Sequence, residues 1–97
     1  MFQTMTAEMV LEEIIRCCEK HQVEEAVLFG SRAKGTALPR SDFDIAVSGA
    51  PDFDGLSEDM EEIPTLYTID LVDMDTCGNV LLLEDIKTYG RKIYQKV

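Results

Sequence analysis

The chain has 97 residues and a formal net charge of −10 at pH 7. This length predicts one small domain, residues 1–97, which would gain stability from a protein partner or from a second copy of itself. A chain this acidic lacks the basic face that binds nucleic acid or an anionic membrane. Neither is therefore expected as a direct partner. No stretch approaches the ~18 consecutive apolar residues of a membrane span, and residues 1–4 lack the basic start of a signal peptide.

Cysteine and histidine usage narrows the metal chemistry. The three cysteines, Cys17, Cys18 and Cys77, show neither the spacing of a metal finger nor a disulfide framework. With His21 as the only histidine, a zinc site is not expected. We therefore expect the protein to work in the reducing cytoplasm. We also expect any bound metal to be a hard cation with oxygen ligands.

Helical and extended patterns alternate along the chain. After the capping residue Thr6, apolar residues recur at spacings of three and four through Val10, Ile14 and Cys18, which predicts an amphipathic helix that ends near residue 21. The remaining predicted elements are a strand at 26–29, a helical turn at 31–35, a strand at 43–47, an acidic helix at 54–63, a strand at 66–72, a helix from 80 to the terminating Gly90, and an edge strand at 92–95. This order indicates an α/β or α+β fold, with a small mixed β-sheet flanked by helices.

A Gly-Ser pair follows the first predicted strand. Gly30 allows the backbone to approach a ligand closely, and the free amides that open the next turn favour phosphate oxygens. Ser31 adds a hydroxyl that donates to the same group. Taken alone, such a pair is usually an ordinary turn.

Two carboxylates follow this turn at a set distance. Ten residues separate Ser31 from Asp42, and Asp44 follows after one intervening residue. Since side chains alternate along a strand, both acids project from one face, with α-carbons about 6.5–7 Å apart. Two metal ions about 3.5–4 Å apart fit between carboxylates at this spacing, and a cation would relieve their repulsion.

A third acid, Asp70, interrupts the predicted strand at 66–72 on the face opposite Tyr67, Ile69 and Leu71. An unpaired acid is unfavourable there unless it has a partner. Asp70 joins Asp42 and Asp44 if its strand neighbours theirs. The Gly-Ser turn ends one strand and the paired acids open the next, so these meet only if the two strands are antiparallel.

These residues resemble the nucleotidyltransferase superfamily related to DNA polymerase beta, and in particular its minimal nucleotidyltransferase domains. The family pattern of Gly-Ser, ten residues and Asp-x-Asp is matched by Gly30, Ser31, Asp42 and Asp44, and its later strand aspartate by Asp70. The C-terminal residues 86–94 are also similar to the helix and edge strand that end these domains. The likeness covers most of the chain.

The resemblance implies transfer of a nucleoside monophosphate, AMP from ATP, to a hydroxyl. Asp42 and Asp44 would bind two Mg²⁺ ions, Asp70 would bind the metal at the acceptor hydroxyl and serve as its base, and Gly30 and Ser31 would hold the phosphates. Arg32 is expected at the nucleotide, and Lys34 and Arg40 are further candidates for contact with the triphosphate. Each of the three basic residues is equally compatible with a plain surface position.

The resemblance also implies a partner. Minimal family members commonly bind a helical HEPN protein that acts as a toxin, and the nucleotidyltransferase is its antitoxin, in some cases by adding AMP to the toxin. A hetero-oligomer or a homodimer is therefore expected. Two other interpretations stay open: a non-catalytic module that neutralises its partner by complex formation, and a nucleotide sensor that binds ATP without turnover.

Overall fold

The computed structural model describes residues 5–38 and 41–97. Its elements in chain order are α1 (Ala7–Lys20), β1 (Glu25–Phe29), α2 (Ser31–Lys34), β2 (Phe43–Ser48), α3 (Phe53–Glu61), β3 (Ile69–Asp73), α4 (Val80–Tyr89) and β4 (Arg91–Gln95). No helix in these two ranges is both long enough and apolar enough to cross a membrane.

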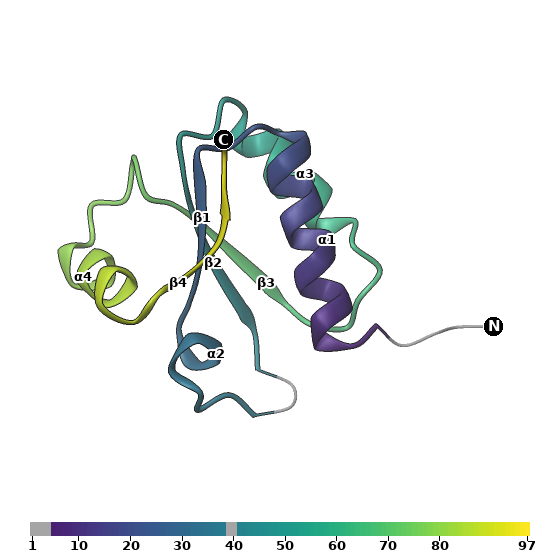
Figure 1. Ribbon diagram of the computed structural model, residues 1–97, viewed down its shortest axis with the longest axis horizontal. Coiled ribbons are helices and arrows are strands. Elements are labelled where there is room, and N and C mark those ends of the chain that lie inside the picture. The colour runs from purple at the N-terminus through teal and green to yellow at the C-terminus, as the bar shows by residue number, and fades with distance from the viewer. Residues whose placement is uncertain (1–4, 39–40) are drawn as a thin grey trace.

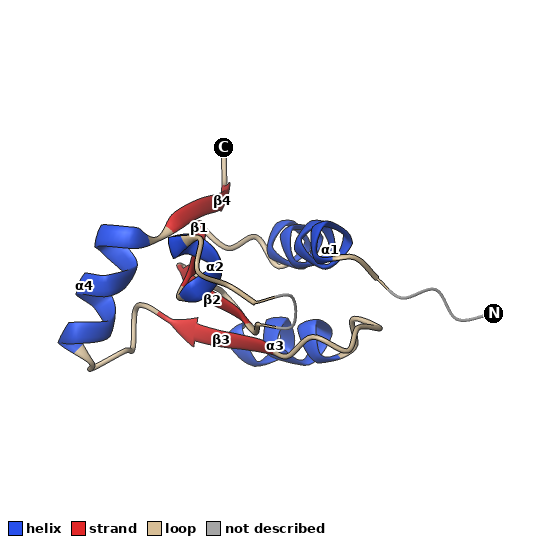
Figure 2. Ribbon diagram, turned by 90° about the horizontal axis from the view of Figure 1, so that it is seen from below, coloured by secondary structure: helices blue, strands red, loops and turns tan. Residues whose placement is uncertain are grey.

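The strands form a four-stranded sheet in the order β3-β2-β1-β4. β1 runs antiparallel to both β2 and β4, while β2 and β3 are parallel. Helices cover both faces: α1 and α3 lie on one side and α4 on the other, with α2 at one end of the sheet (Figures 1 and 2). The predicted mixed sheet flanked by helices is confirmed, as are the antiparallel β1–β2 pair and the edge position of β4.

The larger part of the core lies under α1 and α3. Thr6 caps α1 by accepting a hydrogen bond from the Met9 amide at 3.2 Å, and the predicted stripe of Val10, Ile14 and Cys18 is fully buried. Burial raises the pKa of the Cys18 thiol to about 12. This cysteine therefore stays protonated at neutral pH and acts as a packing residue.

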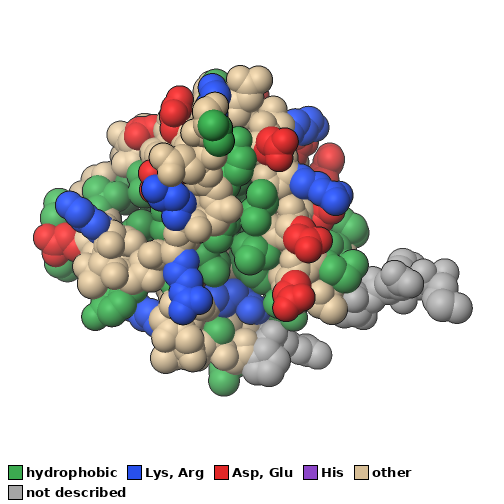
Figure 3. All heavy atoms as spheres, in the orientation of Figure 1, with side chains coloured by type: hydrophobic (Ala, Val, Ile, Leu, Met, Phe, Trp, Pro, Cys, Tyr) green, Lys and Arg blue, Asp and Glu red, His purple; other side chains and the backbone are tan. Residues whose placement is uncertain are grey.

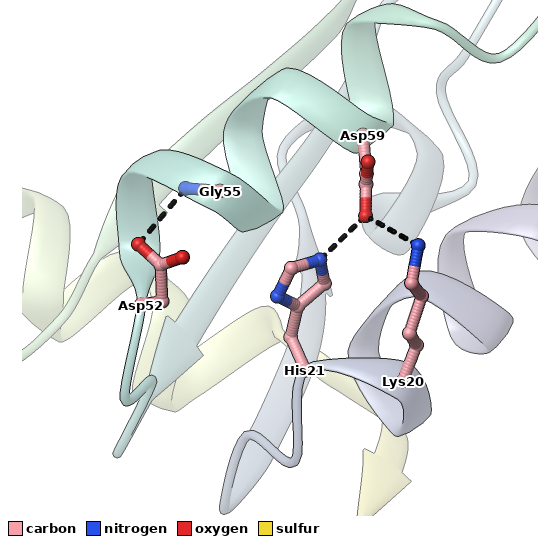
Figure 4. A network of polar contacts seen from close by, with 5 residues as sticks. All are labelled: Lys20, His21, Asp52, Gly55 and Asp59. Atoms are coloured by element: carbon pink, nitrogen blue, oxygen red, sulfur yellow. Dashed lines mark hydrogen bonds and ion pairs between the residues drawn. The ribbon is translucent and has the colours of Figure 1, made fainter.

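The two helices on this face are also joined by polar contacts at the end of α1. His21 Nε2 lies 2.6 Å from Asp59 Oδ2, and Lys20 Nζ lies 3.1 Å from the same oxygen (Figure 4). The hydrogen bond to His21, followed by that to Lys20, lowers the pKa of Asp59. Asp59 thus connects α3 to the C-terminus of α1.

The opposite face has a smaller apolar cluster. Val27, Phe29 and Ala46 of the sheet pack there with Ile86 of α4. Alternation along β2 accounts for this division, because Phe43, Ile45 and Val47 enter the larger core while Ala46 faces α4. Asp44 shares the face of Ala46, and this places the acid on the α4 side of the sheet.

The third predicted strand starts three residues too early. The strand expected at 66–72 begins only at Ile69, because the hydroxyl of Thr65 accepts a hydrogen bond from the Tyr67 amide at 3.1 Å and bends the chain. Leu66 lies in this bend and is 93% exposed. The apolar residues of this segment therefore predicted a longer strand than the structure has.

Candidate active site

The turn after β1 brings the backbone close to an acid of β2. Phe29 is paired with Asp44 in the antiparallel register, so Gly30 lies beside the carboxylate. A Cβ on Gly30 would overlap Asp44 Oδ2 and lie 3.1 Å from its Cγ. Gly30 also has φ +72° and ψ −154°, a combination that is essentially restricted to glycine. Glycine is thus required here both for its backbone conformation and for the space that Asp44 occupies.

The residues after Gly30 form the short helix α2. The amides of Ala33 and Lys34 both donate to the Gly30 carbonyl, at 3.2 and 3.1 Å. The amides of Ser31 and Arg32 come before this first helical hydrogen bond. Amides in this position favour phosphate oxygens, which keeps the predicted phosphate contact at Gly30 and Ser31 a prediction.

Two of the three predicted acids lie side by side. In the parallel register of β2 and β3, Asp44 is paired directly with Asp70. The neighbouring pair, Ala46 and Val72, belongs to the α4-side cluster, which shows that both acids point to that face. The condition that Asp70 lie on a strand next to β2 is therefore met.

Burial raises the pKa of Asp44, and the charges of Asp70 and Asp42 together with a hydrogen bond to Asp70 raise it further. Protonation or a bound cation would each relieve the repulsion, and carboxylate oxygens suit a hard cation such as Mg²⁺. The donor chemistry of this pair therefore fits magnesium.

The third acid is less closely placed. Asp42 immediately precedes β2 and is exposed. Its charge contributes to the raised pKa of Asp44. Among residues 5–38 and 41–97, no three His, Cys, Asp or Glu side chains are close enough together to hold a metal ion. Asp44 and Asp70 are thus paired on neighbouring strands, and Asp42 lies just before β2.

Arg32 is half-buried and contacts the residues on either side of Asp42. Its Nε and Nη2 atoms both donate to the Ser41 carbonyl, at 3.0 and 2.7 Å. The guanidinium carbon also lies 4.1 Å from the ring centroid of Phe43 and 5.1 Å from that of Tyr67. Arg32 therefore joins α2 to the residue just before Asp42, a contact that no sequence pattern revealed.

The other two basic residues differ in what the structure describes. Lys34 Nζ lies 2.9 Å from Asp85 Oδ1, so this side chain is directed to α4. Arg40 lies outside the described residues.

The sequence model of the polymerase beta nucleotidyltransferase family matches residues 12–97. The chain belongs to this nucleotidyltransferase family. The match includes the Gly30 turn and all three acids, and it confirms the family expected from the motif. No curated protein matches the chain in sequence.

Solved structures share the fold of this nucleotidyltransferase domain. A chain in a toxin–antitoxin crystal structure with AMP-PNP is 26% identical, with a TM-score of 0.70 over 89% of this chain and 73% of that one. A tyrosine-to-alanine mutant of the MntA–HpeT toxin–antitoxin complex gives 26% identity and a TM-score of 0.69 over 88% and 72% of the two chains. A double Asp-to-Glu mutant of that complex is 22% identical, with a TM-score of 0.67 over 89% of this chain and 73% of that one. This similarity shows a shared fold.

Proposed function

We propose that this nucleotidyltransferase transfers AMP from ATP to a hydroxyl group on a partner protein. The observation that carries the proposal is the pairing of Asp44 with Asp70 on neighbouring strands, beside the Gly30 turn. A phosphate-binding turn and paired carboxylates at one end of a sheet are the parts that metal-assisted nucleotidyl transfer requires.

Each side chain has a defined task in this proposal. Asp42, Asp44 and Asp70 would hold two Mg²⁺ ions, which would supply positive charge to the triphosphate and to the reacting oxygens. Gly30 and Ser31 hold the β- and γ-phosphates, so that the bond to the departing pyrophosphate is in line with the incoming oxygen. Asp70 is exposed, and this leaves it free to accept the proton of the acceptor hydroxyl.

Arg32 acts at the nucleotide end of this site. Its contact with the Ser41 carbonyl holds the residue that precedes Asp42, and the adjacent positive charge favours a bound triphosphate. Both effects support binding of ATP at the turn.

The proposed acceptor is a toxin-type partner of the HEPN class, and the chain would be its antitoxin. Support comes from the relatives at 26% identity, which are chains of toxin–antitoxin complexes, one of them crystallised with AMP-PNP. We propose a single domain, residues 1–97, that works in the cytoplasm as a hetero-oligomer with the toxin or as a homodimer.

A second candidate function is neutralisation of the partner by complex formation alone. It is favoured by the lack, among the residues with described positions, of three side chains arranged to hold a metal. In that case the acids would at most bind a nucleotide and no AMP would be transferred.

The test uses ATP labelled at the α-phosphate, Mg²⁺ and a lysate of the native host. A labelled protein band with wild type, absent with the Asp42→Asn/Asp44→Asn double variant, is the expected result, and mass spectrometry of that band identifies the acceptor. If wild type still binds a partner but labels nothing, the masking function replaces the catalytic one.

A further inference from the structure

Lys34, at the end of the phosphate-binding turn, is held by two residues of α4. Its Nζ atom lies 2.9 Å from Asp85 Oδ1 and 4.9 Å from the centroid of the Tyr89 ring. Asp85 and Tyr89 are four residues apart and therefore share one face of the helix. The ammonium group thus has an acid and an aromatic ring as neighbours.

The position of Lys34 connects these contacts to the candidate active site. Lys34 and Ser31 are three residues apart in α2, which makes them neighbours on the surface of that turn. Asp44 points to the sheet face that α4 covers, and α2 lies at the end of the same sheet (Figures 1 and 2). The Lys34 ammonium is therefore on the same side of the sheet as the acids.

One face of the molecule carries basic side chains near this end. In Figure 3, the blue side chains of Lys and Arg lie over the region of α2 and β4, whereas red acidic side chains border α1.

The ion pair itself is weak enough to be exchanged. The Lys34 and Asp85 side chains are 37% and 31% exposed, so water competes with the contact. A polyphosphate offers several charged oxygens to an ammonium group, whereas Asp85 offers a single carboxylate. A triphosphate at the Gly30 turn would therefore compete well for the Lys34 side chain.

We propose that Asp85 is a built-in competitor for the nucleotide: it holds Lys34 in the free protein and gives it up to the polyphosphate of a bound nucleoside triphosphate. Tyr89 keeps the ammonium group close to the turn during this exchange. The inference rests on the proposed function, since it assumes that the Gly30 turn binds a triphosphate. It makes Lys34 a binding residue and Asp85 a residue that sets nucleotide affinity.

The exchange predicts the direction in which each substitution changes the affinity for nucleotide. Removing the charge of Asp85 frees Lys34 in advance, so affinity for the nucleotide rises by about two- to fivefold, the equivalent of a partly exposed ion pair. Removing Lys34 deletes a charge-assisted contact and lowers affinity by about ten- to a hundredfold. Without Lys34, the loss of Asp85 has no further effect.

The test is calorimetric titration of the full chain with AMP-PNP and Mg²⁺. The expected order of affinity is Asp85→Asn above wild type, and wild type above both Lys34→Ala and the Lys34→Ala/Asp85→Asn double variant, which bind equally. Asp59→Asn is the matched control, because Asp59 also pairs with a lysine of another helix but does so on the opposite face of the sheet, and its affinity should equal that of wild type.

Asp85→Ser repeats the measurement with a smaller side chain, and the melting temperature of every variant reports whether it is folded. If wild type binds AMP-PNP but neither folded Asp85 variant binds more tightly, the competitor role is wrong and the ion pair only fastens α4 to α2. If wild type binds no AMP-PNP, the proposed function and this inference are both overturned.

Discussion

Replacing Gly30 by alanine tests the link between the turn and the acids. The added Cβ would overlap Asp44 Oδ2 and lie 3.1 Å from Cγ, so the carboxylate must rotate away from its position. The backbone at φ +72° and ψ −154° adds strain, because only glycine populates this region readily.

The expected loss of stability follows from three terms. Backbone strain costs about 1–3 kcal/mol, and an off-rotamer Asp44 costs about 0.5–1.5 kcal/mol. Alanine recovers about 0.4–1 kcal/mol by restricting the unfolded chain. Together these terms lower the free energy of unfolding by about 0.5–4 kcal/mol, with a midpoint of about 2 kcal/mol. Transfer should slow by about 100-fold, because the carboxylate proposed to bind metal is misplaced by about 1 Å.

Gly35 provides the matched control. It also has a positive φ, +76°, but a Cβ there would meet nothing within 4 Å. Gly35→Ala should therefore lose only about 1 kcal/mol from left-handed strain and keep its transfer rate. Urea denaturation followed by circular dichroism measures the stabilities, and label transfer from ATP measures the rates. Equal effects of the two substitutions on both quantities would refute the spacing role of Gly30.

Two further predictions concern single side chains. Arg32→Lys loses the two-pronged contact with the Ser41 carbonyl and the stacking on Phe43, so unfolding free energy should fall by about 1–2 kcal/mol in urea titrations; an unchanged midpoint would contradict this. Asp59→Asn should lower the melting temperature at pH 6, because the His21 contact lowers the pKa of Asp59 below the ordinary 3.8 and so stabilises the fold above that pH. The stabilisation disappears as pH falls through the lowered pKa, so the two melting temperatures should converge in acid, and a gap independent of pH would disprove the ionic contribution.

Much of the fold was predictable because local rules and tertiary packing agree here. The stripe of Val10, Ile14 and Cys18 has helical spacing and is fully buried, and Gly90 ends α4 as expected. The alternation from Phe43 to Val47 put Asp44 on the correct face. The antiparallel pairing of β1 and β2 followed from the need to bring the turn and the acids together.

The parts that escaped prediction depend on contacts between residues distant in sequence or on local hydrogen bonds. Hydrophobicity extended the third strand back to Leu66, but the Thr65 side chain bends the backbone there. The sequence explained only part of the need for glycine at position 30. Asp44, the residue that a Cβ there would overlap, lies on another strand. The partners of Arg32 and Lys34 are the Ser41 carbonyl and Asp85, and neither carries a sequence signal for that contact.

The most direct test of nucleotidyl transfer compares ATP labelled at the α-phosphate with ATP labelled at the γ-phosphate. Both are incubated with Mg²⁺, the chain and its partner protein, and the protein-bound label is counted for wild type and for Asp44→Asn. The account predicts label on protein only from the α-position and only with wild type, because AMP is retained and pyrophosphate leaves. Label from the γ-position, or α-label that survives Asp44→Asn, would contradict it.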